Sequence, residues 1–158
     1  MSNELIAKSV IKKLSKLKKS LSVAESITGG GLAKTLTDIP GSSKVFVGGV
    51  IAYSDEVKIN HLSVSKSNIK KYGPVSEEVV LEMAHSCLKK FKTDYALATT
   101  GVAGPGMAYG KKAGTVWIAV AGKKESFTVA LSLPCTREVI LHATIASALS
   151  ALERILKS

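Results

Sequence analysis

Polar side chains and glycines gather in residues 24–30, which read A-E-S-I-T-G-G and directly follow a short apolar segment. A serine at the junction of a strand and a helix is exposed and can act as a nucleophile. The unpaired N–H groups at the start of such a helix can bind a phosphate or stabilise an oxyanion. Ser26 is therefore a candidate nucleophile. The alternative is that Ser26 and Thr28 cap the helix and that the glycines only form its turn.

A second group of reactive side chains follows the next apolar run. Tyr53, Asp55, Glu56 and Lys58 supply a phenol, two carboxylates and an amine within six residues. Lys58 could take a proton from a serine near neutral pH only if its pKa fell by several units from about 10.4, at a cost of about 1.4 kcal/mol for each unit. Burial or a neighbouring cation would be required. The alternative is a helix start in which Ser54 is the N-cap and Lys58 lies in solvent.

A third group, T-T-G-V-A-G-P-G at 99–106, is again an apolar run that leads into glycines. Ligands of α/β sheets bind outside the carboxyl ends of the strands. Three such polar strand ends in one small chain favour a single shared pocket over three unrelated turns.

The rest of the chain predicts the elements that position these groups. Helices are expected at 4–19, from 28 to about 38, after Ser76 to Phe91 and after Thr136, with short helices or turns at 54–62 and 65–72. Strands are expected at 21–25, 45–53, 95–100, 115–121 and 126–133, the last two as an antiparallel pair. Helices that alternate with strands, plus one hairpin, predict an α/β fold with a mixed sheet covered on both faces.

Length and composition favour one globular domain spanning 1–158. The chain is 46% hydrophobic and 22% charged, and no apolar run approaches the roughly 20 residues that a membrane span needs. The N-terminal segment is an amphipathic stretch rich in lysine, without the features of a secretion signal. We therefore expect a cytoplasmic protein that does not contact the membrane.

The cysteines and histidines do not indicate a metal centre. Cys87 and Cys135 lie in or beside apolar segments and are expected to pack in the core. His61, His85 and His142 are far apart in the sequence and lack paired ligands, so no metal is expected.

The formal net charge of +10 raises the question of nucleic acid binding. The lysines are spread along the chain, and no aromatic residues alternate with them to form a stacking surface. Nucleic acid is therefore a disfavoured partner. A module that binds a nucleotide or nucleic acid without chemistry remains the alternative to an enzyme.

Several motifs together resemble a known family. A-E-S-I-T-G-G-G at 24–31, I-A-Y-S-D-E-V-K at 51–58, G-P-V-S at 73–76, T-G-V-A-G-P at 100–105 and G-T-V-W at 114–117 occur in the order and spacing of the CinA family. The similarity is to its C-terminal domain, known as the nicotinamide-nucleotide amidase domain, and extends over about residues 4–156. It implies a single-domain, three-layer α/β/α sandwich.

The resemblance also implies a reaction, in which nicotinamide mononucleotide is deamidated to nicotinate mononucleotide with release of ammonia. By motif position, Ser26 would be the nucleophile, Lys58 its base, and Tyr53 would relay or orient the proton through an acyl-enzyme path. Backbone N–H groups of Thr28, Gly29 and Gly30 would hold the phosphate or the oxyanion. The loop from Thr100 to Pro105, with Gly101, Ala103 and Gly104, would shape the pocket. No cofactor and no metal are implied, and a homo-oligomer is expected.

Two segments depart from the family pattern. A glycine pair and Lys-Pro usually follow Gly104-Pro105, whereas this chain has M-A-Y-G-K-K-A at 107–113 in a slightly shorter loop. The Gly-Asp-Arg that often precedes the last helix is C-T-R at 135–137, so only Arg137 is kept. Arg137 is expected either to meet a phosphate or to sit in the first turn of the helix.

Overall fold

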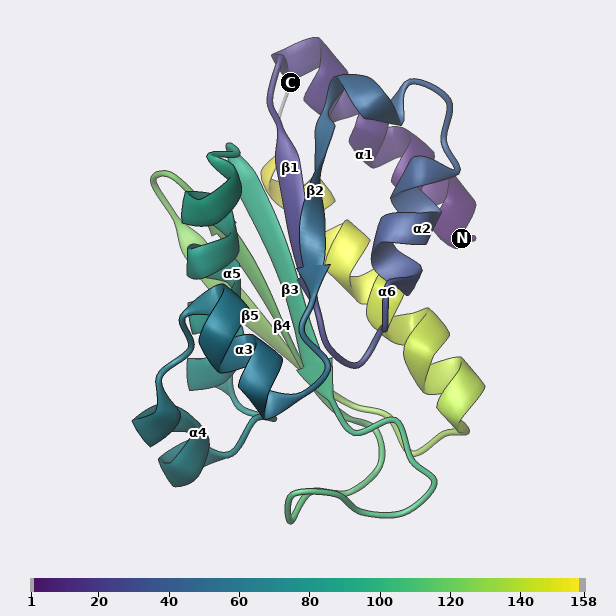
Figure 1. Cartoon of the computed structure of the whole chain (residues 1–158). Coiled ribbons are helices and arrows are strands. Elements are labelled where there is room, and N and C mark those ends of the chain that lie inside the picture. The colour runs from purple at the N-terminus through teal and green to yellow at the C-terminus, as the bar shows by residue number, and fades with distance from the viewer. Residues whose placement is uncertain (1, 157–158) are drawn as a thin grey trace.

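The computed structural model describes residues 2–156, in which one five-stranded sheet forms the centre of the molecule (Figure 1). Its strands are β1 (Leu21–Glu25), β2 (Phe46–Ile51), β3 (Tyr95–Gly101), β4 (Thr115–Gly122) and β5 (Ser126–Ser132). They lie in the order β2-β1-β3-β4-β5. The pairs β1–β2 and β1–β3 are parallel, whereas β3–β4 and β4–β5 are antiparallel. The predicted mixed sheet and its hairpin are confirmed.

Helices cover both faces of the sheet and complete the expected three layers. One face carries α1 (Asn3–Leu17), α2 (Gly31–Thr37) and α6 (Arg137–Ile155), and the other carries α3 (Asp55–Leu62), α4 (Lys66–Tyr72) and α5 (Glu77–Phe91) (Figure 1). A short 3-10 helix, Ser42–Lys44, leads into β2. The α/β/α sandwich is therefore confirmed, as one domain.

The two faces of the sheet bury two separate hydrophobic clusters, and each matches an amphipathic helix. Ile6, Val10 and Leu14 of α1 pack in the cluster that α2 and α6 share. Val79, Met83 and other apolar residues of α5 fill the cluster on the opposite face. β1 lies between two parallel strands, and helices cover it on both faces. All five of its residues are therefore buried.

Side-chain caps set where the longer helices begin. The hydroxyls of Ser54, Ser76 and Thr136 accept hydrogen bonds from the backbone N–H three residues later, at the starts of α3, α5 and α6. These are the N-terminal boundaries that the sequence predicts. At its C-terminal end α1 stops at Leu17, two residues earlier than expected, because Lys18 adopts a left-handed conformation.

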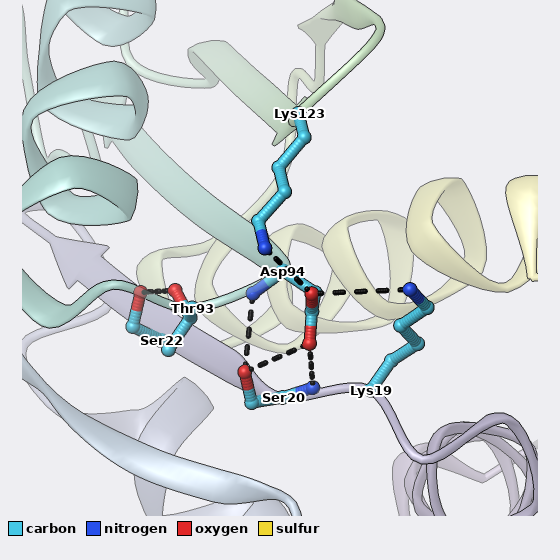
Figure 2. Close-up of polar contacts among 6 residues, drawn as sticks. All are labelled: Lys19, Ser20, Ser22, Thr93, Asp94 and Lys123. Atoms are coloured by element: carbon cyan, nitrogen blue, oxygen red, sulfur yellow. Dashed lines mark hydrogen bonds and ion pairs between the residues drawn. The ribbon is translucent and has the colours of Figure 1, made fainter.

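Asp94 binds several groups at the end of the sheet where β1 and β3 begin, as Figure 2 shows. Its carboxylate accepts hydrogen bonds from the backbone N–H of Ser20, at 2.9 Å, and from the Ser20 hydroxyl, at 3.1 Å. Lys123, in the turn between β4 and β5, lies 3.2 Å from the same carboxylate, and Lys19 lies 3.9 Å away. Asp94 thus joins the segments that enter β1 and β3 to the turn that links β4 and β5.

The expectation for the cysteines is half correct. Cys87 is buried in α5, as predicted. Cys135 is exposed, so the prediction that it packs in the core is wrong. It follows the end of β5 and precedes the cap of α6, where the chain runs over the surface. Within residues 2–156, no helix is both long enough and apolar enough to cross a membrane.

Candidate active site

A pocket of about 200 Å³ opens at the carboxyl ends of the parallel strands. Eight of the residues singled out from the sequence line it, from all three polar groups and from the start of α6: Ser26, Tyr53, Lys58, Thr100, Gly101, Ala103, Gly104 and Arg137. The expectation of one shared pocket is confirmed. Thr28, Gly29 and Gly30 are not among its lining residues.

Ser26 is fixed in a turn directly after β1. Its backbone N–H donates to the carbonyl of Thr99, at 3.0 Å, and its own carbonyl accepts the N–H of Gly29, at 3.1 Å. Gly29 and Gly30 have φ of +57° and +100°, a region that favours glycine. The two glycines therefore let the chain turn sharply from β1 into α2 while the Ser26 side chain faces the pocket.

Lys58 lies inside the protein, not in solvent. Its side chain is only 2% exposed, so the interpretation of a solvated lysine is wrong, although Ser54 does cap α3. The Lys58 Nζ lies 3.0 Å from the Ser26 Oγ. Burial lowers the pKa of Lys58 from its ordinary value, and the negative charge of Asp55 opposes part of that change. The burial that a lysine base requires is therefore present, and it acts on the pKa in the required direction.

Two backbone carbonyls orient the amine. The Lys58 Nζ donates to the carbonyl of Ala52 at 2.9 Å and lies 3.4 Å from that of Tyr53. A neutral amine has two N–H bonds and one lone pair. With both N–H bonds directed at the carbonyls, the lone pair is directed at Ser26, whose hydroxyl can then donate to Nζ.

Some of the backbone N–H groups after Ser26 are used within the turn itself, and others are not. The N–H of Gly29 closes the turn on Ser26, and the N–H of Gly31 donates to the carbonyl of Thr28 at 2.8 Å. The turn uses neither the N–H of Ile27 nor that of Thr28. Ile27 also lines the pocket and directly follows Ser26. Its N–H is therefore the candidate donor to an oxyanion formed at Ser26.

Glu25 is the residue of this region that sequence reasoning did not single out. Its side chain is fully buried, and its carboxylate accepts hydrogen bonds from the backbone N–H groups of Leu32 and Ala33. The N–H groups at the start of α2 are therefore occupied within the protein. The available signal in the sequence was an acidic residue at the end of a segment expected to be a buried strand, directly before the serine.

Arg137 and the segment after β3 form the outer wall of the pocket. Arg137 is the first residue of α6, and its Nη1 donates to the carbonyl of Gly104 at 2.6 Å. Beyond Gly104, Met107 and Tyr109 also line the pocket and are 66% and 62% exposed. Tyr53 stands at the rim, 60% exposed. The outer wall thus combines the guanidinium of Arg137 with the exposed side chains of Met107 and Tyr109.

No cluster of three or more His, Cys, Asp or Glu side chains suited to a metal ion occurs in the part of the chain that the structure describes. The polar groups around the Ser26 hydroxyl are the Lys58 amine, the carbonyls that bind this amine, and the backbone N–H groups of the turn. Their chemistry is that of proton transfer and of anion stabilisation.

The sequence matches one family model, described as the CinA C-terminal domain, over residues 3–156. A CinA-like protein of Pseudothermotoga lettingae is 44% identical over 138 residues, which cover 87% of this chain and 34% of that protein. One from Thermosipho melanesiensis is 42% identical, over 99% of this chain and 39% of that protein. The chain therefore spans about a third of the length of the curated relatives it matches.

Solved structures share the whole fold. The competence/damage inducible protein CihA of Agrobacterium tumefaciens superposes with a TM-score of 0.94 at 32% identity, covering 98% of this chain and 96% of that one. The competence damage-inducible protein A (ComA) of Klebsiella pneumoniae gives a TM-score of 0.96 at 31% identity, covering 99% and 98%.

Proposed function

This chain belongs to the CinA family, through that family's C-terminal domain, and we propose that it is an amidohydrolase that deamidates nicotinamide mononucleotide. The observation that carries the proposal is the 3.0 Å approach of the buried Lys58 Nζ to the Ser26 Oγ. A lysine with a lowered pKa and a serine in contact form a nucleophile and its base without a histidine.

The first half of the reaction forms an acyl-enzyme. Neutral Lys58 accepts the hydroxyl proton of Ser26 while Oγ attacks the carbonyl carbon of the carboxamide. The resulting oxyanion accepts a hydrogen bond from the N–H of Ile27. When the tetrahedral intermediate collapses, the C–N bond breaks and protonated Lys58 returns the proton to the leaving nitrogen, which departs as ammonia.

The second half restores the enzyme. A water molecule takes the place of ammonia, and neutral Lys58 accepts one of its protons as the water oxygen attacks the acyl carbon. The ester bond to Ser26 then breaks, the proton returns from Lys58 to Oγ, and the product leaves as a carboxylic acid, which loses its remaining proton to the solvent. Tyr53, at the rim, is proposed to orient the carboxamide or relay a proton.

Arg137 is proposed to bind the phosphate of the substrate. Its guanidinium lies in the pocket wall and uses one N–H on Gly104, so further donors remain for a phosphate. The start of α2 is a poor alternative because Glu25 already accepts its N–H groups. Thr100, Gly101 and Ala103 would then shape the space between Ser26 and Arg137 for the ribose and the ring.

An ammonia-release assay on nicotinamide mononucleotide tests the proposal. The wild-type chain should release ammonia, and Ser26→Ala should lose at least about 1000-fold in kcat while still binding the nucleotide. Ser67→Ala is the matched control, since Ser67 is an exposed serine of α4. Equal turnover by wild type and Ser26→Ala would overturn Ser26 as the nucleophile. Binding without turnover by both would leave a nucleotide-binding module as the better description.

A further inference from the structure

The side chain of Glu25 is fully buried, and the proposed reaction does not use it directly. Glu25 ends β1 and immediately precedes Ser26. Its Oε1 accepts the N–H of Leu32 at 2.8 Å, and its Oε2 accepts the N–H of Ala33 at 2.9 Å. A buried carboxyl group is costly unless hydrogen bonds satisfy it. Both oxygens are satisfied here, so the start of α2 is tied to the end of β1.

A third bond extends this link to the neighbouring strand. The hydroxyl of Thr28 donates to Glu25 Oε1 at 2.5 Å, and the Thr28 Oγ1 lies 2.9 Å from the Thr99 Oγ1. The carbonyl of the same Thr99 accepts the backbone N–H of Ser26 at 3.0 Å. The side chain of Glu25 and the end of β3 therefore hold the Ser26 turn from two sides.

The main chain of Glu25 reaches the base. Its carbonyl accepts the N–H of Ala52 at 2.7 Å, and the carbonyl of Ala52 in turn accepts a hydrogen bond from the Lys58 Nζ at 2.9 Å. Glu25 is thus linked by hydrogen bonds through Ala52 to the amine of Lys58, and through Thr28 and Thr99 to the backbone N–H of Ser26.

We infer that Glu25 is a positioning residue, whose buried carboxylate fixes the Ser26 turn against α2 and Thr99 so that Oγ stays within reach of Lys58. This inference rests on the proposed function, since it assigns Glu25 a part in the same reaction. Glu25 touches neither the substrate nor the reacting atoms. A displacement of about 1 Å between reacting groups can cost about 100-fold in rate, which gives the expected size of its effect.

Glu25→Gln is the direct test. An amide has one acceptor oxygen and one NH₂ group, so a donor would face the N–H of Leu32 or of Ala33 and the turn would shift. We expect kcat to fall about 100-fold with KM within about two-fold. The midpoint of the pH profile should stay where it is in the wild type, because Lys58 remains buried beside Asp55.

Glu82→Gln is the matched control. The Glu82 carboxylate accepts the N–H of Ser65 at 3.0 Å and the side-chain amide of Asn68 at 2.6 Å, so it holds the start of α4 as Glu25 holds that of α2. It does not line the pocket. Glu82→Gln should show a comparable loss in Tm but an unchanged kcat, which separates positioning from general stability.

Thr28 provides a second pair of variants, which keep the inference testable if Glu25→Gln does not fold. Thr28→Val removes the hydroxyl that bridges Glu25 and Thr99 and leaves the bonds to α2 in place. It should lower kcat by about 10-fold. Thr28→Ser restores the hydroxyl and should restore kcat. Equal kcat for Thr28→Val and Thr28→Ser, both folded, would overturn the inference.

Labelling of Ser26 by a fluorophosphonate separates this inference from the choice of substrate. The labelling rate should fall in Glu25→Gln by about the same factor as kcat, and should not fall in Glu82→Gln. If the wild type is labelled at Ser26 yet does not deamidate nicotinamide mononucleotide, the substrate is wrong and the slower labelling of Glu25→Gln still supports positioning. If folded Glu25→Gln matches wild type in labelling and turnover, Glu25 is not a positioning residue. A wild-type chain with neither activity overturns both proposals.

Discussion

The Lys58 Nζ lies 3.0 Å from the Ser26 Oγ and 2.9 Å from the carbonyl oxygen of Ala52. This carbonyl and that of Tyr53 hold the two N–H bonds of the neutral amine and so orient its lone pair towards Ser26. The side chain is only 2% exposed, so most of it lies out of contact with bulk water. In the proposed reaction, the protonation state of Lys58 therefore decides whether the hydroxyl of Ser26 is activated.

The pH dependence of activity should follow Lys58. Burial lowers its pKa, and Asp55 opposes this change, so Asp55→Asn should lower the pKa further. Because the neutral amine is the active form, the acidic limb of kcat/KM should move to lower pH in Asp55→Asn. The matched control is Glu56→Gln, an exposed acid in the same helical turn, which should leave the limb in place. A limb that moves upward in Asp55→Asn would contradict the assignment of Lys58 as the base.

Lys58→Met and Lys58→Arg separate the base from its charge. Lys58→Met removes the amine, and Lys58→Arg keeps a cation that cannot lose its proton, so kcat should fall by about 1000-fold in both. A cation alone would suffice if Lys58 only stabilised negative charge, and Lys58→Arg would then retain activity. An ammonia-release assay decides between these outcomes.

The same substitution should change how stability depends on pH. In the wild type the unfolded chain carries Lys58 at its ordinary pKa of 10.5, whereas the folded chain has a lowered pKa. The unfolded state therefore binds more protons between those two values, and the free energy of unfolding rises with pH across that window. Lys58→Met should lack this contribution. The measurement is denaturant unfolding of both proteins at several pH values.

Arg137 should discriminate substrates by their phosphate. Arg137→Gln should raise KM for nicotinamide mononucleotide by about 10- to 100-fold, which corresponds to the loss of about 1.5–3 kcal/mol for a hydrogen bond to a charged group. KM for nicotinamide riboside, which lacks the phosphate, should stay within about two-fold. Equal losses for both substrates would mean that Arg137 acts only by holding the carbonyl of Gly104.

The two cysteines should differ sharply in reactivity. Burial raises the pKa of Cys87 to about 11, so it should not react with a thiol reagent at pH 8 in the folded protein. Cys135 is exposed and should react at once. The expected titration is one thiol for the native chain and two after denaturation. Cys135→Ser should give no reactive thiol in the native chain and one after denaturation.

Regular elements were predictable because their signals are local. Ser54, Ser76 and Thr136 were each followed by residues with helical periodicity, and each caps a helix in the structure. The helices of the two outer layers and the antiparallel pair of strands were predictable from equally local patterns. Cys135 was predicted wrongly because an apolar neighbourhood in sequence does not fix which side of the chain faces the core.

The site was only partly predictable, for a physical reason. Residue type identified Ser26 and Lys58 as candidates, but burial of Lys58 depends on β1, β2 and α3 coming together, which no local pattern encodes. The same holds for Glu25, whose partners Leu32 and Ala33 are seven and eight residues away on a helix. The resemblance to the CinA family supplied the pairing that periodicity could not.

β3 and β4 are antiparallel neighbours, and residues 102–114 join them. Because β3 ends and β4 begins at the same edge of the sheet, residues 102–114 leave from the pocket and return to it (Figure 1). Insertions or deletions there would alter what the mouth admits without shifting β1, which leads into Ser26, or α3, which carries Lys58. Evolution could therefore change which ligand the pocket accepts on this one segment while the contact between Lys58 and Ser26 stays as it is.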